Sequence, residues 1–129
     1  MAIRVVRLGT PRARNEGLRI GTVRRPPRGV PKSEFASGNW YDVWFPDLAP
    51  SVATMKLGLG ASTPAQWAAF VRKYRAEMAR PEADHAIALL AALSRTADFS
   101  VGCYCENEAR CHRSVLRQLL AGRGALFAD

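Results

Sequence analysis

The chain of 129 residues lacks any apolar run near the roughly 20 residues that a membrane-spanning helix needs. Its first residues, MAIRVVRLG, also lack the apolar stretch of a signal peptide. We therefore expect a cytoplasmic protein without a membrane partner. Hydrophobic residues make up 48% of the chain, which predicts a folded core rather than a disordered chain. The length suits one domain over residues 1–129.

Cysteine is scarce, and its three copies all fall within residues 103–111. A secreted disulfide framework uses an even number of cysteines that are spread along the chain. The odd, crowded set does not match that pattern, so we expect reduced thiols.

Acidic side chains are almost absent from residues 1–32, where Glu16 stands beside nine basic residues. This segment carries the whole formal net charge of +8, because basic and acidic residues balance in the rest of the chain. Such an asymmetry is typical of a face that meets nucleic acid, nucleotide or phosphate. The alternative is a solvated surface in an arginine-rich chain, since arginine outnumbers lysine sixteen to three.

Hydrophobic periodicity and turn residues divide the chain into strands followed by helices. The pattern predicts strands at 2–8, 18–23, 41–45 and 98–106. It predicts helices at 52–59, 64–80 and 83–96 and from near Cys111 to Gly122. Because helices lie between the late strands, we expect an α/β fold, a single-domain sandwich with a partly parallel sheet flanked by helices.

The stretch GCYCENEARCHRS (102–114) holds every cysteine and one of the two histidines. It reads as a strand end, a loop and a helix start. Ligands of α/β proteins collect outside the carboxyl ends of the strands. A helix start adds unpaired N–H groups and the positive end of the helix dipole. We therefore predict an anion-binding or nucleotide-binding site over residues 105–113.

Residue types in this loop suggest individual roles. The thiol of Cys111, near the helix start and Arg113, should have a lowered pKa and act as a nucleophile. Glu106 is positioned to orient His112 or to serve as a general base. Arg113 and His112 supply donors for phosphate or carboxylate.

Two other interpretations of the cluster remain open. Cys103, Cys105, Cys111 and His112 are soft ligands that zinc accepts, but the C-x-C and C-H spacings differ from zinc knuckles. Neighbouring helical residues also point about 100° apart. We therefore predict no metal and no cofactor. In the second interpretation Cys103 is a small buried core residue and the acidic residues form a solvated turn.

Four segments, PRGVPK, YDVWFPDLAPS, WAAFVRKYRAEM and CHRSVL, resemble the YeaO-like family of small bacterial proteins, a domain of unknown function. The similarity covers roughly residues 2–122. It implies a compact α/β domain and a site at Cys105, Glu106, Cys111, His112 and Arg113.

The loop TVRRPPRG departs from the family, in which an aspartate and a tryptophan are common at this place. We expect Arg24 and Arg28 of this loop to add a second wall to the site and to favour a more anionic ligand.

The leading hypothesis is a protein that binds a phosphate-containing small molecule at residues 105–113, with an enzyme of unassigned reaction as one form of it. One alternative is a nucleic-acid binding module that uses the arginine-rich first quarter. The other is a thiol-redox or interaction module. The sequence does not specify an oligomeric state.

Overall fold

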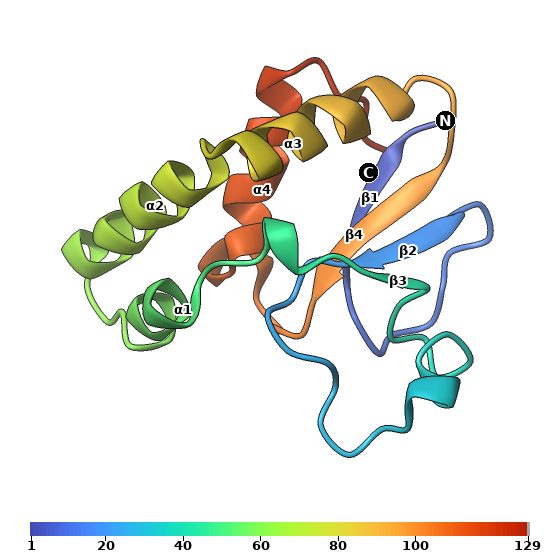
Figure 1. The fold of residues 1–129 in the computed structure, drawn as a ribbon, viewed down its shortest axis with the longest axis horizontal. Coiled ribbons are helices and arrows are strands. Elements are labelled where there is room, and N and C mark those ends of the chain that lie inside the picture. Colours follow the sequence, from blue (N-terminus) through green and yellow to red (C-terminus); the bar gives the residue numbers. More distant parts are fainter. Residues whose placement is uncertain (129) are drawn as a thin grey trace.

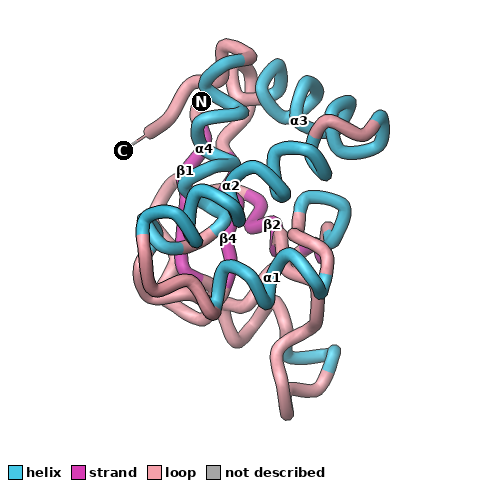
Figure 2. Tube along the Cα trace, turned by 90° about the vertical axis from the view of Figure 1, so that its left-hand side faces the viewer, coloured by secondary structure: helices cyan, strands magenta, loops and turns pink. Residues whose placement is uncertain are grey.

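A computed structural model describes residues 1–128 as a four-stranded sheet with its α-helices gathered on one side (Figures 1 and 2). The strands are β1 (Ile3–Arg7), β2 (Leu18–Gly21), β3 (Val43–Trp44) and β4 (Phe99–Cys103). The helices are α1 (Val52–Leu59), α2 (Pro64–Met78), α3 (Pro81–Leu93) and α4 (His112–Gly122). Short 3-10 turns lie at Lys32–Glu34, Pro46–Leu48 and Glu108–Arg110.

The sheet has the strand order β1-β4-β2-β3, and each of these neighbouring pairs is parallel. This confirms the predicted α/β class. The sheet is more parallel than expected. Because β4 lies between β1 and β2, these two consecutive strands do not pair with each other as a hairpin. Residues 8–17 join these two strands as a loop without a helix.

The core between the sheet and the helices follows the predicted periodicity. Ile3, Phe99 and Val101 face the helices from the strands and are buried. The stripe on α2 is buried at Phe70 and Tyr74, so it packs in the core as expected. Thr63 and Gln66 form the predicted capping box at its start, which stabilises the first turn. None of the helices in residues 1–128 has the length and apolar character needed to cross a membrane.

The opposite face of the sheet is covered by loops. A Cβ at Gly21 would lie 2.4 Å from the ring of Tyr41, so only glycine lets the loop approach β2 this closely. Arg19 also points to this side and is fully buried. Its guanidinium donates to the Glu16 carboxylate at 2.6 and 3.0 Å and to backbone carbonyls of the covering loops.

The strand predicted at 98–106 was too long, because β4 ends at Cys103. Beyond that residue the backbone groups leave the sheet. The Cys105 N–H donates to the Cys103 sulfur at 3.4 Å, and the Cys105 carbonyl accepts from Arg113. These side-chain partners replace the ladder, so the alternation of faces stops before Cys105.

Candidate functional site

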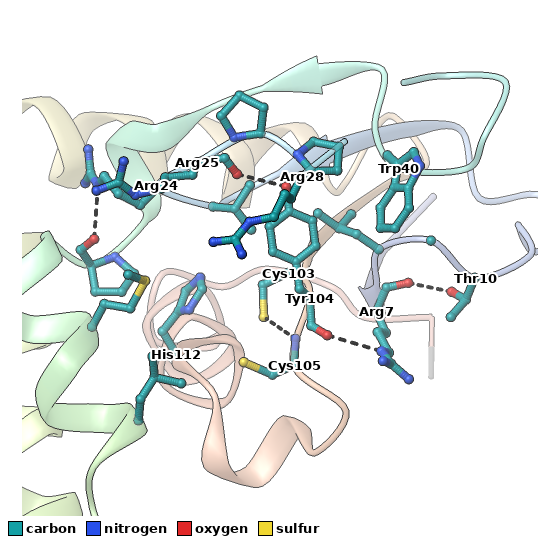
Figure 3. Close-up of a pocket in the computed structure, with 18 residues that line it drawn as sticks. Arg7, Thr10, Arg24, Arg25, Arg28, Trp40, Cys103, Tyr104, Cys105 and His112 are labelled. Atoms are coloured by element: carbon teal, nitrogen blue, oxygen red, sulfur yellow. Dashed lines mark hydrogen bonds between the residues drawn. The ribbon is translucent and has the colours of Figure 1, made fainter. Parts of the chain in front are cut away.

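A cavity of about 730 Å³ opens at the carboxyl ends of β1, β2 and β4, beside the start of α4. Figure 3 shows Arg24, Arg25 and Arg28 on one side of it and Cys103, Cys105 and His112 on the other. Parallel strands bring their carboxyl ends to one edge, where ligands of α/β proteins bind. The cavity therefore lies where the sequence predicted a site.

His112, the first residue of α4, is held at both ring nitrogens. Nε2 lies 2.7 Å from the carbonyl oxygen of Thr22, and Nδ1 lies 3.7 Å from the sulfur of Cys111. A carbonyl only accepts hydrogen bonds, so Nε2 carries the proton. When Nδ1 is unprotonated, it presents a lone pair to the Cys111 sulfur.

Glu106 does not orient this histidine, contrary to the role predicted for it. Its side chain is 84% exposed and pairs with Arg7 at 3.6 Å. The turn after β4 carries the carboxylate away from the start of α4, and the Thr22 carbonyl takes its place. Glu106 is also absent from the cavity wall.

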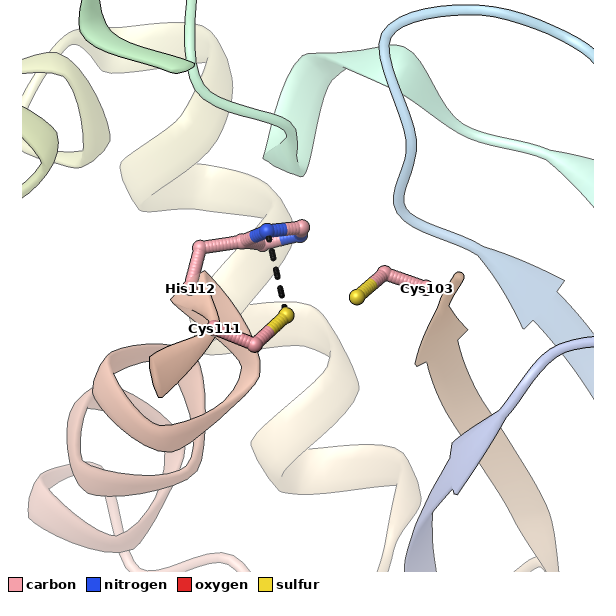
Figure 4. A group of neighbouring side chains, drawn as sticks. All are labelled: Cys103, Cys111 and His112. Atoms are coloured by element: carbon pink, nitrogen blue, oxygen red, sulfur yellow. Dashed lines mark hydrogen bonds between the residues drawn. The ribbon is translucent and has the colours of Figure 1, made fainter. Parts of the chain in front are cut away.

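Cys111 precedes α4 as its N-cap, with an extended backbone (φ −129°, ψ 153°). Its sulfur therefore does not follow the helical direction and turns toward the end of β4. Figure 4 shows the side chains of Cys103, Cys111 and His112 converging. One potential ligand atom from each lies within 4.8 Å of the other two, and all three residues are buried.

The three thiols influence one another. Hydrogen bonding to Cys105 and Cys111 raises the pKa of Cys103, so this thiol keeps its proton. Hydrogen bonding from Cys103 lowers the pKa of Cys105, and the charge of Arg113 acts in the same direction. Cys103 also lowers the pKa of Cys111, with His112 as a further cause. Cys105 is the half-buried member and lines the cavity.

Arg113 lies beneath the cavity rather than on its wall. Only 3% of the residue is exposed, and its NH2 group donates to the Cys105 carbonyl at 2.5 Å. Its guanidinium also interacts with the sulfur of Cys111, and Nε has no hydrogen-bond partner in residues 1–128. Arg113, which was predicted to bind an anion, thus stabilises the turn at Cys105 and contacts the buried sulfurs.

Arg24 and Arg28 both line the cavity, but they differ in what their side chains bind. Arg24 donates to the carbonyls of Pro46, Ala49 and Pro50 at 3.1 to 3.2 Å, which ties the proline-rich loop to the segment before α1. Arg28 is exposed and has no hydrogen-bond or ion-pair partner within residues 1–128. Only Arg28 of these two keeps its guanidinium available to a ligand.

Arg25, Trp40 and Tyr104 are among the wall residues that the sequence did not predict. The sequence carries a signal for Arg25, since it stands between Arg24 and Arg28, which are both predicted site residues. Tyr104 stands between two cysteines, but its hydrogen bond from the hydroxyl to the Arg25 carbonyl at 2.8 Å depends on tertiary structure. Trp40 comes from a distant loop, and no local pattern indicates its place.

Much of the basic first quarter is used inside the molecule. Arg19 is buried in its ion pair with Glu16, and Arg12 pairs with Asp42 at 2.8 Å. Arg24 is bound to loop carbonyls, as described above. The charge asymmetry therefore overstates the positive charge that an external anion meets.

Comparison with known families matches residues 3–124 to DUF488-N3a, described as the active DUF488-N3 subclade. The chain belongs to the DUF488-N3a family. This confirms the resemblance to a family of domains of unknown function. Comparisons with curated proteins and with solved structures gave no match. The reaction and the ligand of this DUF488-N3a domain are thus argued from its own site.

Proposed function

We propose that this DUF488-N3a domain binds a phosphate-bearing small molecule of the nucleotide type in the cavity at the carboxyl ends of β1, β2 and β4. The observation that carries the proposal is the position of Arg25 and Arg28. Both arginines lie on the cavity wall, both are exposed, and neither guanidinium has a hydrogen-bond or ion-pair partner in residues 1–128. A guanidinium without a protein partner is suited to phosphate, because its planar fork donates two hydrogen bonds at once.

The loop that carries these arginines is stiff, which favours binding. Pro26 and Pro27 fix φ between them, and the Arg25 carbonyl accepts the hydroxyl of Tyr104 at 2.8 Å. Arg24 holds the start of the loop against carbonyls near α1. A loop that is already ordered loses less conformational entropy when a ligand binds.

The rest of the wall suits an apolar or aromatic portion of the ligand. Trp40 and Tyr104 line it with ring centroids 6.0 Å apart, and Met55 and Leu59 of α1 add aliphatic surface. Aromatic faces bind planar rings by stacking. A volume of about 730 Å³ lies within the range of small-molecule sites and accommodates a base, a sugar and a phosphate.

Of the predicted cysteine and histidine cluster, Cys103, Cys105 and His112 line the cavity. Cys111 and Glu106, the predicted catalytic pair, do not. If the domain is an enzyme, we expect Cys105 and His112 to stand nearest to the bound molecule.

Calorimetric titration with inorganic phosphate, AMP and ADP tests this proposal. We expect a nucleotide to bind more tightly than phosphate alone, since the walls contact its base. Arg28→Ala and Arg25→Ala should each weaken binding by about tenfold or more, because each removes charge-assisted hydrogen bonds. Arg14→Ala is the matched control, as Arg14 is an exposed arginine of the same segment that does not line the cavity.

Equal losses for Arg14→Ala and Arg28→Ala would contradict the pocket, because they would indicate general attraction by positive charge. The nucleic-acid alternative would then gain support from binding to single-stranded DNA that falls steeply with salt concentration. Absence of binding to all three ligands at low salt would overturn the proposal.

A further inference from the structure

Two segments that are separate in sequence bring soft ligand atoms together under the cavity. Cys103 ends β4, while Cys111 and His112 begin α4. Their ligand atoms lie within 4.8 Å of one another (Figure 4). In tetrahedral zinc sites, metal–sulfur and metal–nitrogen bonds of about 2.3 and 2.0 Å place neighbouring ligand atoms about 3.5 to 3.8 Å apart. The 3.7 Å from the Cys111 sulfur to His112 Nδ1 matches this spacing.

The backbone conformation of Cys111 removes the objection that sequence spacing raised. Adjacent residues inside a helix point away from each other. Cys111 is extended and stands outside α4, whereas His112 is helical. Their side chains therefore converge, and the end of β4 supplies Cys103 from the facing element.

The hydrogen bond from His112 to Thr22 is of the kind that metal-binding histidines make. Such histidines donate the N–H of the second ring nitrogen to a carbonyl or carboxylate, which fixes the tautomer and the ring plane. Here Nε2–H donates to the Thr22 carbonyl at 2.7 Å, and Nδ1 lies 3.7 Å from the Cys111 sulfur. The ring is thus already oriented for a metal on its Nδ1 side.

We infer that Cys103, Cys111 and His112 form a three-ligand site for a zinc-class divalent ion with a fourth position open to the cavity. Thiolate and imidazole ligands favour Zn²⁺ over Mg²⁺ or Ca²⁺. Three protein ligands with one free position are typical of catalytic rather than structural zinc. Cys103 and His112 also line the cavity, so the free position faces it. The Cys105 thiol interacts with Cys103 and Cys111, but its sulfur is not one of the three ligand atoms that all lie within 4.8 Å of one another.

A zinc ion at this place would act as a Lewis acid toward a molecule in the cavity. That use rests on the proposed function, whereas metal binding itself depends only on the three ligands.

The zinc content of the purified protein tests the metal site directly. We expect protein purified without a polyhistidine tag, in the presence of a reductant, to carry about one zinc per chain by mass spectrometry. Cys103→Ser and His112→Gln should each lower the zinc content by about tenfold or more. Cys105→Ser is the matched control, because it removes a thiol from the same cluster but not a ligand, and it should keep the zinc. Circular dichroism of each variant reports whether it is folded.

Cobalt gives a second readout that needs no variant. Co²⁺ added to metal-free wild type should produce the visible absorption of a tetrahedral ion and a sulfur-to-cobalt charge-transfer band. Failure of reduced wild type to hold zinc or to give these bands would overturn the site. Loss of zinc in Cys105→Ser would overturn the open position, since it would mean that four protein ligands close the site.

Separate experiments can contradict the nucleotide site and the zinc site. Arg25→Ala and Arg28→Ala should keep zinc while they lose nucleotide, and the nucleotide titration can be repeated on metal-free protein. Zinc binding without any nucleotide binding would leave the metal site standing and remove the proposed function.

Discussion

Arg19 and Arg113 are both almost fully buried, yet their surroundings differ. Every nitrogen of the Arg19 guanidinium donates to an acceptor, and the Glu16 carboxylate neutralises its charge. Arg113 donates to one carbonyl, leaves Nε without a hydrogen-bond partner and has no carboxylate ion pair within residues 1–128. The charge of Arg19 is thus neutralised by a buried carboxylate, whereas Arg113 has no such partner and lies beside cysteine sulfurs.

The difference follows from the position of each arginine on the sheet. Arg19 lies on the face that the loops cover, where Ser100 also donates to Glu16 at 2.6 Å. Arg113 lies at the carboxyl edge, beside sulfur atoms and below the cavity. Buried polar groups in proteins are nearly always satisfied, so an exception calls for an explanation. A site that holds an anionic ligand or a metal with thiolates provides one.

The largest effect on stability that we predict is at Arg19, whose charge the Glu16 carboxylate neutralises. Arg19→Met should lower the free energy of unfolding by about 3–5 kcal/mol, because it leaves the Glu16 carboxylate buried without its cation. Urea denaturation measures this change. Arg14→Met, at an exposed position, should stay within about 0.5 kcal/mol of wild type. Similar values for the two variants would contradict the view that the Arg19 pair stabilises the fold.

A somewhat smaller loss of stability should appear at low pH, where the Glu16 carboxylate becomes protonated. Burial raises the pKa of the Glu16 carboxyl, but hydrogen bonds from Arg19 and Ser100 outweigh burial and lower it from 4.5 to about 2. The carboxylate therefore contributes about 3 kcal/mol that is fully present above about pH 4.5 and is lost as the pH falls through about 2. Denaturation at several pH values should show a shallower slope over this range for Glu16→Gln. An unchanged slope would contradict the assignment.

The sequence predicted the α/β class and the helices well because these depend on local periodicity and caps. Thr63 and Gln66, for example, form the expected capping box at the start of α2. The position of β4 between β1 and β2 was not predictable, since Ile3 and Phe99 pair across most of the chain. Such long-range pairing leaves no local pattern.

The place of the candidate site was predictable from the strand-end rule, but its accessible groups were not. The packing of α4 against β4 decides which arginine side chain a ligand can reach. This packing buries Arg113, while Arg28 stays exposed. The same limit applies to Cys105, because a side-chain hydrogen bond from Arg113 ends the alternation of β4 early. The convergence of Cys103 with Cys111 likewise depends on tertiary structure.

The smallest effect on stability should follow from removing Arg113, the buried cation without a carboxylate partner. Arg113→Met deletes one hydrogen bond to the Cys105 carbonyl, but it also removes a buried charge whose Nε has no partner. These terms oppose each other, so the free energy of unfolding should change by no more than about 1 kcal/mol. Urea denaturation of reduced, metal-free protein, beside Arg19→Met, gives the comparison. A loss as large as that of Arg19→Met would show that thiolate charge on Cys105 or Cys111 already compensates Arg113 within the apoprotein.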